Sequence, residues 1–265
     1  MSVVLHLSDT HFGTERAEVV AALLHLSAQQ QPDVAVLSGD VTQRGRSDEF
    51  AAAKQFVDAL SARTKLVLPG NHDIPLFDVG RRVFAPYLNH RRAFGSTLEP
   101  EYEDEALLIV GVRTTRRYRH VDGTVSARQV ARTSARLRVG GTRLKLVVTH
   151  QPVHVQRNED AHNLLRGRAA ALRGWSQAGA DLILGGHIHL PFVAPLREAH
   201  GLPREVWAVQ AGTAVSRRTR PGVPNSVNLI RHAPGAGSCT IERWDFAADH
   251  QAFQLGESTD VALDR

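Results

Sequence analysis

The feature that most constrains this chain is a repeated unit in which a short apolar run ends abruptly in polar residues. In residues 65–73 the apolar run 65–68 is broken by Pro69 and Gly70 and is followed by an Asn-His-Asp turn. Proline and glycine end a strand sharply. Each of the three polar side chains can bind a metal ion or transfer a proton, and packing alone explains them poorly. The turn is therefore a candidate functional site.

Apolar runs alternate with helix-like segments through the first quarter of the chain. Strands are predicted at 3–7, 34–37 and 65–68, with helices at 16–29 and from Ser47 onward. Strand, helix, strand is the pattern of a parallel sheet covered by helices. In such sheets ligands bind beyond the carboxyl ends of the strands. The polar residues that follow the strands should therefore meet in one crevice.

The rest of the chain continues this pattern and then changes. Further strands are predicted at 107–112, 144–148 and 182–184, and helices at 128–137 and 163–176. Short β-like runs between 191 and 246 predict an antiparallel closing sheet. Residues from about 249 are polar enough to form a loose tail. With no repeat or long linker, we expect one domain over 1–265.

Composition indicates the charge of the substrate and the cellular compartment in which the protein is expected. The 265 residues carry a formal charge of +5 with a pI of about 10.0, so an anionic substrate is expected. The one cysteine, Cys239, cannot form an intrachain disulfide, which fits a reducing compartment. A core strand at 3–7 leaves no room for a signal peptide, and no apolar run reaches the ~20 residues of a membrane helix. We expect a cytoplasmic protein with no membrane association.

Residue types that bind metal ions or transfer protons follow five apolar runs. They are Asp9 and His11, Asp40, Asn71 and His72, His150, and His187 with His189. Taken singly, each has an ordinary explanation, such as a turn, a helix cap or a packed histidine. Together they recur at one predicted edge of the sheet, which favours a shared metal site.

In order, these residues form the motifs Asp-x-His at 9–11, Gly-Asp at 39–40, Gly-Asn-His-Asp at 70–73, His at 150 and Gly-His-x-His at 186–189. The set resembles that of the calcineurin-like metallophosphoesterase superfamily and spans most of the chain. The resemblance implies an α/β fold, the four-layer α/β/β/α sandwich with two central sheets. It also implies a metal-dependent phosphoric ester hydrolase.

The resemblance further implies a role for each motif residue. Two divalent metal ions would be bound, one by Asp9, His11 and His189, the other by Asn71, His150 and His187, with Asp40 bridging both. His72 would be the general acid or would stabilise the transition state. Asp73 would orient His72.

The chemistry of these residues agrees with that assignment. Mixed imidazole and oxygen ligands suit Mn, Fe, Zn or Co. Because only Asp9 and Asp40 would be charged, two divalent ions would leave a net charge of about +2, which suits a phosphate anion. The implied reaction is attack of a metal-bridging hydroxide on phosphorus, with His72 protonating the leaving oxygen.

At two positions this chain differs from particular subgroups of the superfamily, and these differences narrow the choice of subgroup. Purple acid phosphatases carry a tyrosine ligand where this chain has Gln43, so a tyrosinate-iron site is not expected. Ser/Thr protein phosphatases have Glu where Asp73 stands. The pattern is most similar to small bacterial phosphodiesterases that resemble class III cyclic-nucleotide phosphodiesterases.

Arginines supply candidate substrate contacts. Arg44 and Arg113 are the residues predicted to contact the substrate phosphate. The Arg-rich loops 113–120 and 216–220 could grip phosphate or stack on a base, or could be solvated surface, and the sequence leaves this open. His162 is predicted to lie on the surface.

Three functions fit the sequence. The first is a phosphodiesterase that hydrolyses a nucleotide or another small organic phosphodiester, and a homodimer is compatible with it. The second is a metal-dependent nuclease acting on DNA or RNA. The positive charge favours a nuclease, but we expect no sizeable extra capping domain after His189 that could hold DNA. The third is a non-catalytic scaffold, which would be expected to lose His72 or metal ligands.

Overall fold

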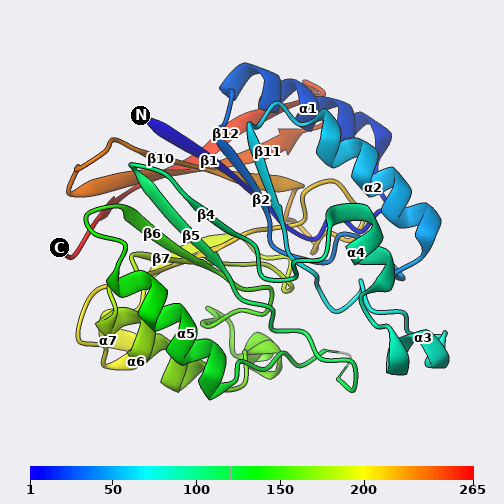
Figure 1. Cartoon of the computed structure of the whole chain (residues 1–265). Coiled ribbons are helices and arrows are strands. Elements are labelled where there is room, and N and C mark those ends of the chain that lie inside the picture. The colour runs from blue at the N-terminus through cyan, green and yellow to red at the C-terminus, as the bar shows by residue number, and fades with distance from the viewer. Residues whose placement is uncertain (120) are drawn as a thin grey trace.

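The computed structural model describes residues 1–119 and 121–265 and shows two six-stranded sheets packed face to face. Figure 1 shows helices α1 and α2 over the outer face of one sheet and α5 and α6 against the outer face of the other. The predicted four-layer α/β/β/α sandwich is confirmed. Within the described residues, no helix is both long and apolar enough to cross a membrane.

The first sheet has the order β12-β11-β10-β1-β2-β3. Its strands are β1 (Ser2–Leu7), β2 (Val34–Leu37), β3 (Thr64–Val67), β10 (Ser226–His232), β11 (Ser238–Ala247) and β12 (Ala252–Ala262). β1, β2 and β3 are parallel, and β10 to β12 extend the sheet with antiparallel pairing. The predicted antiparallel closing sheet is thus present beside β1.

The second sheet has the order β4-β5-β6-β7-β9-β8. Its strands are β4 (Glu101–Glu103), β5 (Leu107–Gly111), β6 (Leu144–Val148), β7 (Leu182–Gly185), β8 (Phe192–Pro195) and β9 (Trp207–Gln210). β9 pairs parallel to β7, so part of the late β region continues the parallel core instead of closing it. At the two edges of this sheet, β4 pairs antiparallel with β5, and β8 pairs antiparallel with β9.

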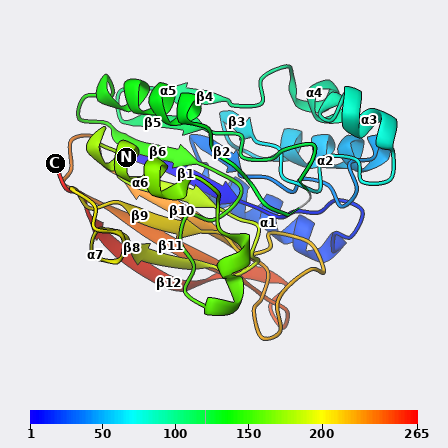
Figure 2. The same cartoon turned by 90° about the horizontal axis from the view of Figure 1, so that it is seen from below.

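Helices connect the strands and cover both outer faces. They are α1 (Ala17–Gln30), α2 (Ser47–Ala59), α3 (Val79–Phe84), α4 (Leu88–Phe94), α5 (Ala127–Arg138), α6 (Arg168–Gln177) and α7 (Arg197–His200), with a 3-10 helix at Asn158–Asn163. Figure 2 gives the view from the α5–α6 side, and in both views α3 lies at the edge of the molecule, away from the sheets.

Three apolar cores hold the layers together. Alternate residues of β1 point to opposite faces: Leu5 and Leu7 pack against α1, while Val4 packs between the sheets. The central core joins Val4 to side chains of the second sheet such as Leu146. A third core, which includes Trp175 of α6, covers the other face of the second sheet. Burying both faces of each sheet fixes the strand ends in which the polar residues lie.

Two expectations about chain segments are wrong. Residues 252–262 form β12 rather than a loose tail, and they pair along their whole length with β11. The helix expected at 163–176 is split, because a 3-10 helix ends at Asn163 and α6 begins only at Arg168. Gly167, in the left-handed conformation, separates the two.

Candidate metal centre

The polar residues that follow β1, β2, β3, β6 and β7 converge at the carboxyl ends of these strands. The side chains brought together are Asp9, His11, Asp40, Asn71, His72, His150, His187 and His189. Asp9 and His11 are fully buried, and Asp40 and His150 are 1% exposed. The parallel connections of both sheets therefore direct their polar turns into one crevice, as the sequence predicted.

The first cluster contains Asp9, His11 and His189. One potential ligand atom from each lies within 4.8 Å of the others. The Nε2 atom of His189 is 3.4 Å from Oδ1 of Asp9 and 3.4 Å from Nε2 of His11. Two imidazoles and a carboxylate around one point form a donor set suited to a divalent transition metal.

The second cluster contains Asp40, His150 and His187, again with ligand atoms within 4.8 Å of one another. Nε2 of His150 lies 3.3 Å from Oδ1 of Asp40 and 3.1 Å from Oδ1 of Asn71, so the Asn71 amide oxygen joins this cluster. Oδ2 of Asp40 is also 3.8 Å from Nε2 of His11. Asp40 thus stands between the two clusters.

Buried polar atoms without partners test whether a metal ion fits. Among the described residues, Oδ1 of Asp9 and Nε2 of His187 are buried and have no hydrogen-bond partner. Leaving such a group unpaired costs about 1–3 kcal/mol, so each one calls for an explanation. A divalent cation would satisfy the carboxylate oxygen and the imidazole lone pair together. The residues present therefore fit a metal ion in each cluster.

The electrostatics of the site favour bound positive charge. Burial raises the pKa of Asp40, but His150, His72 and His11 outweigh it and hold that pKa well below its usual range. Burial opposes protonation of His150, yet Asp40 raises its pKa to about 9. Burial and the neighbouring His150 lower the pKa of His187 to about 3, which keeps that ring neutral and able to bind a cation.

Five of these residues share an unusual backbone conformation. Positive φ angles occur at Asp9 (54°), His11 (42°), Asp40 (47°), His187 (75°) and His189 (56°). Residues other than glycine adopt such angles infrequently, and when they do they cluster at functional sites. The backbone is held there by hydrogen bonds between turns, for example from Asp9 N to the Gly39 carbonyl at 3.0 Å.

Two glycines allow the turns to approach each other. A Cβ atom at Gly70 would lie 2.0 Å from the backbone N of Asp40, and one at Gly186 would lie 1.8 Å from Oγ of Ser8. Real Cβ atoms do not come so close to other atoms. Glycine is therefore required at both positions for the clusters to assemble.

His72 lies beside both clusters, and Gln43 holds its ring. The Nδ1–H of His72 donates to the Gln43 carbonyl at 2.9 Å, and the His72 backbone N–H donates to Oδ1 of Asp40 at 2.8 Å. The His72 and His11 rings meet edge to face with centroids 4.9 Å apart. Because a carbonyl can only accept, this contact places a proton on Nδ1.

Asp73 accepts hydrogen bonds from two neighbouring turns, and its predicted role in orienting His72 stays a prediction. Its carboxylate accepts hydrogen bonds from the backbone N–H of Gly70 at 2.7 Å, of Val41 at 3.2 Å and of Thr42 at 2.9 Å, and from the Thr42 hydroxyl at 2.8 Å. Burial raises the pKa of Asp73 to about 7. Asp73 therefore ties the turn after β3 to the turn after β2.

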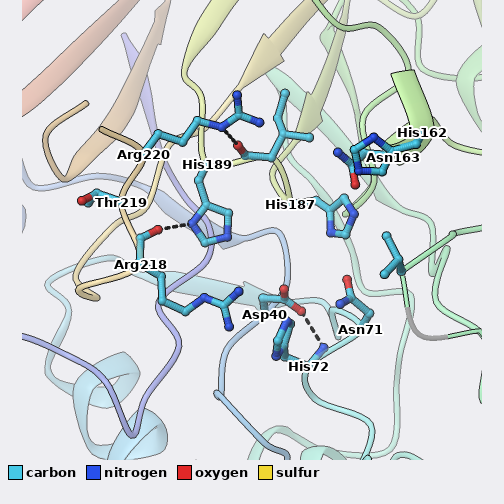
Figure 3. Close-up of a pocket in the computed structure, with 12 residues that line it drawn as sticks. Asp40, Asn71, His72, His162, Asn163, His187, His189, Arg218, Thr219 and Arg220 are labelled. Carbon is cyan, nitrogen blue, oxygen red and sulfur yellow. Dashed lines mark hydrogen bonds between the residues drawn. The ribbon is translucent and has the colours of Figure 1, made fainter. Parts of the chain in front are cut away.

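A cavity of about 490 Å³ opens over the clusters, within the usual size range of small-molecule sites. Figure 3 shows the polar side chains that surround it. The lining residues are Asp40, Asn71, His72, Val121, His162, Asn163, His187, Ile188, His189, Arg218, Thr219 and Arg220. His162 is exposed, as predicted, but it also lines the cavity.

The loop 216–220 reaches the cavity, whereas Arg113 does not line it. Arg113 donates to the Tyr87 hydroxyl at 3.0 Å and to the Thr115 carbonyl at 3.1 Å, and its guanidinium stacks on the Tyr87 ring. These contacts hold the Arg113 side chain against Tyr87, and its predicted contact with the substrate phosphate stays a prediction. Arg218 lines the cavity and donates to Oε1 of Gln43 at 3.1 Å. Several cavity residues lie outside the five motifs. The sequence feature that pointed to some of them was the cluster of arginines in 216–220.

Arg220 lines the cavity but is already engaged. Its Nε donates to the Ile188 carbonyl at 2.6 Å, and its guanidinium pairs with the buried Asp160. Ile188 lies between His187 and His189, so Arg220 supports the turn that carries two candidate ligands. Arg44 lines a neighbouring cavity that shares His72 with the main one.

The same fold occurs in solved phosphatases. A purple acid phosphatase from yellow lupin (Lupinus luteus) has a TM-score of 0.77 at 10% identity, covering 99% of this chain and 54% of that chain. A dimetal phosphatase from Danio rerio has a TM-score of 0.67 at 14% identity and covers 99% of both chains. At these identities the likeness shows the fold alone.

The family model for calcineurin-like phosphoesterases matches residues 2–191. The chain belongs to the calcineurin-like phosphoesterase family. A glycerophosphodiester phosphodiesterase, GpdQ, of Enterobacter lignolyticus is 36% identical over 84 residues, 27% of this chain and 29% of that protein. A probable cyclic nucleotide phosphodiesterase of Rhodococcus erythropolis is 25% identical over 203 residues, 70% of this chain and 64% of that protein. The chain spans less than two thirds of either relative.

Proposed function

We propose that this protein is a dinuclear metal-dependent phosphodiesterase that hydrolyses a nucleotide or another small organic phosphodiester. The observation that carries the proposal is the pair of ligand clusters that meet at Asp40 beneath a cavity of about 490 Å³. Two similar proteins named for hydrolysis of glycerophosphodiesters and cyclic nucleotides support the diester class.

The proposed ligand set follows the two clusters. One ion would be held by Asp9, His11 and His189, the other by Asn71, His150 and His187, with Asp40 shared. Mn, Fe, Zn or Co would suit these imidazole and oxygen donors. When bound, such ions supply an activated water for attack at phosphorus and positive charge for the phosphate.

The chain's own residues would orient the ester and supply the proton. His72 lines the cavity, and the Gln43 carbonyl fixes its ring. In the imidazolium form, His72 would donate its second ring proton to the leaving oxygen as the ester P–O bond breaks. Arg218, at the cavity wall, would bind a phosphate oxygen.

A nuclease is the second candidate, and the net charge of +5 is the observation that favours it. Binding to DNA would then weaken steeply with salt, whereas hydrolysis of a small diester would not. The scaffold is disfavoured because His72 and every candidate ligand are present. A cytoplasmic location and a homodimer stay predictions from the sequence.

The test is hydrolysis of bis-p-nitrophenyl phosphate beside p-nitrophenyl phosphate. Chelator-stripped protein would be assayed with Mn²⁺ or Zn²⁺ added back. We expect metal-dependent hydrolysis that favours the diester. Preference for the monoester would contradict the diesterase proposal, and absence of both metal binding and hydrolysis would favour the scaffold.

A further inference from the structure

A second cavity adjoins the first at His72. It has a volume of about 210 Å³ and is lined by Gln43, Arg44, His72, Ile74, Leu76 and Phe77. His72 is shared by the two cavities, so its ring forms part of the boundary between them. The second cavity lies outside the two ligand clusters, in the segment that leads from β3 to α3.

The wall of this second cavity is largely apolar and unusually exposed. Phe77 is 79% exposed and Leu76 is 40% exposed, while Ile74 beneath them is buried. Apolar exposure continues into α3, where Phe84 is 88% exposed. A large aromatic side chain that faces solvent beside a catalytic cavity offers a surface for an apolar ligand group.

Arg44 adds an uncompensated positive charge to the same wall. The nearby Arg46 pairs with Asp48 at 3.0 Å, and Arg81 pairs with Asp78 at 3.2 Å. Arg44 is exposed, and none of the ion pairs in residues 1–119 and 121–265 includes its guanidinium. The nearby Glu49 carboxylate accepts from the Arg44 backbone N–H at 2.9 Å. The second cavity therefore combines an apolar wall with one cation available for an anionic ligand.

The proposed reaction places the leaving alcohol on this side. Attack at phosphorus is in line, so the water and the leaving oxygen lie on opposite sides of the phosphorus. The oxygen of a water bonds to phosphorus as the ester P–O bond breaks, and one proton of that water passes to solvent. The alcohol departs with a proton from His72, which then regains one from solvent. The general acid must lie beside the leaving oxygen. The alcohol attached to that oxygen then extends past His72.

We propose that the cavity lined by Arg44, Ile74, Leu76 and Phe77 binds the leaving alcohol of the phosphodiester. It selects alcohols that combine an apolar body with an anionic group. This inference rests on the proposed function and adds the class of leaving group. The apolar body would pack on Phe77 and Leu76, and the anion would pair with Arg44.

The kinetic test compares two diesters that differ only in the leaving alcohol, benzyl methyl phosphate and 4-carboxybenzyl methyl phosphate. We expect release of the benzyl alcohols rather than methanol, and a higher kcat/KM for the carboxybenzyl ester. Arg44→Ala should lower kcat/KM for the carboxybenzyl ester about fivefold and leave the benzyl ester within about twofold. Arg44→Glu should reverse the preference between the esters.

The matched control is Arg46→Ala. Arg46 is another exposed arginine, two residues from Arg44, and it lines neither cavity. We expect its variant to treat both esters as the parent protein does. Equal loss for both esters in Arg44→Ala, or release of methanol, would overturn the assignment while leaving the phosphodiesterase function intact.

A binding measurement separates this inference from the proposed function. Titration of metal-free protein with 4-carboxybenzyl alcohol, followed by NMR, should shift the Phe77 ring signals, and Arg44→Glu should abolish the shift. If metal-dependent hydrolysis of bis-p-nitrophenyl phosphate failed while this binding persisted, the proposed function would fall and the binding site would stand. Absence of binding to the parent protein would overturn the site.

Discussion

At the scale of single residues, the candidate ligands are held in conformations that their side chains do not favour. A positive φ at a residue such as His187 costs of order 1–3 kcal/mol and persists only where its surroundings impose it. Here a hydrogen bond from His187 N to Oδ2 of Asp9 at 2.8 Å links two turns that carry candidate ligands. The clusters are thus preorganised by contacts between turns.

We predict that His72→Ala retains both metal ions but loses ~10²–10⁴ in kcat on an alkyl diester, because the leaving alkoxide then lacks a proton donor. Steady-state kinetics with benzyl methyl phosphate and metal analysis of the same sample measure this. A p-nitrophenyl ester is the internal control, since that leaving group needs no acid. Unchanged turnover of the alkyl diester would remove His72 from the role of acid.

We predict that Asp40→Ala loses tight metal binding at both clusters, because Asp40 lies between them. Elemental analysis after dialysis gives the number of ions bound per chain. Asp48→Ala is the matched control, since Asp48 is an exposed carboxylate paired with Arg46. Two ions still bound in Asp40→Ala would contradict a bridging role.

Residue types were easier to predict than residue contacts. The His and Asp clusters could be located because each follows an apolar strand. The partner of His72 could not, because a backbone carbonyl such as that of Gln43 has no signature in the sequence. The contact between Arg113 and Tyr87 could not be predicted either, because the two residues lie 26 positions apart in the sequence.

At the scale of elements, the turns after β2 and β3 pack too closely to admit a side chain between them. The Asp73 carboxylate bonds to the backbone of Gly70 in its own turn and of Thr42 in the neighbouring turn. The two turns therefore form one structural unit. The hydrogen bonds of Asp73 can form only because Gly70 lets the turns approach each other closely.

We predict that Gly70→Ala destabilises the protein by about 2–3 kcal/mol, because its Cβ would meet the Asp40 backbone. Denaturant unfolding of the metal-free protein measures this without any contribution from bound ions. Gly237→Ala is the control, since no atom lies within 4 Å of its added Cβ, and a change within about 0.5 kcal/mol is expected. Equal stability of the two variants would show that the turns can separate at little cost.

Elements with regular apolar spacing were predicted well, and irregular ones were not. Strands such as β2 read as continuous apolar runs because both their faces are buried. The start of α6 was missed because residues 164–167, between the 3-10 helix and α6, include leucines and an arginine that are common in helices. Its true boundary depends on Gly167, whose left-handed backbone is visible only in the structure.

At the scale of the whole molecule, β12 completes the first sheet although residues 257–260 within it are all polar. Most of its side chains face solvent at the sheet edge, and Phe253 and Val261 are the ones that are buried. Phe253 joins the core beneath α1, while Val261 joins the core between the sheets. The polar pattern of an edge strand is why this region looked like a tail.

We predict that Phe253→Ala lowers the free energy of unfolding by about 3 kcal/mol, because it empties a packed site next to Phe246. Leu255→Ala, on the same strand but 52% exposed, should change stability by less than about 1 kcal/mol. Thermal and denaturant unfolding measure both. A Phe253→Ala variant as stable as Leu255→Ala would mean that β12 contributes little to the fold.

The two ligand clusters have one more property in common. Each takes side chains from both sheets: His189 of the second sheet completes the cluster of Asp9, and His150 completes that of Asp40. Neither half of the sandwich contains a whole binding site. An ion in either cluster would therefore link the two sheets. Its binding affinity would depend on how accurately the two sheets are positioned relative to each other.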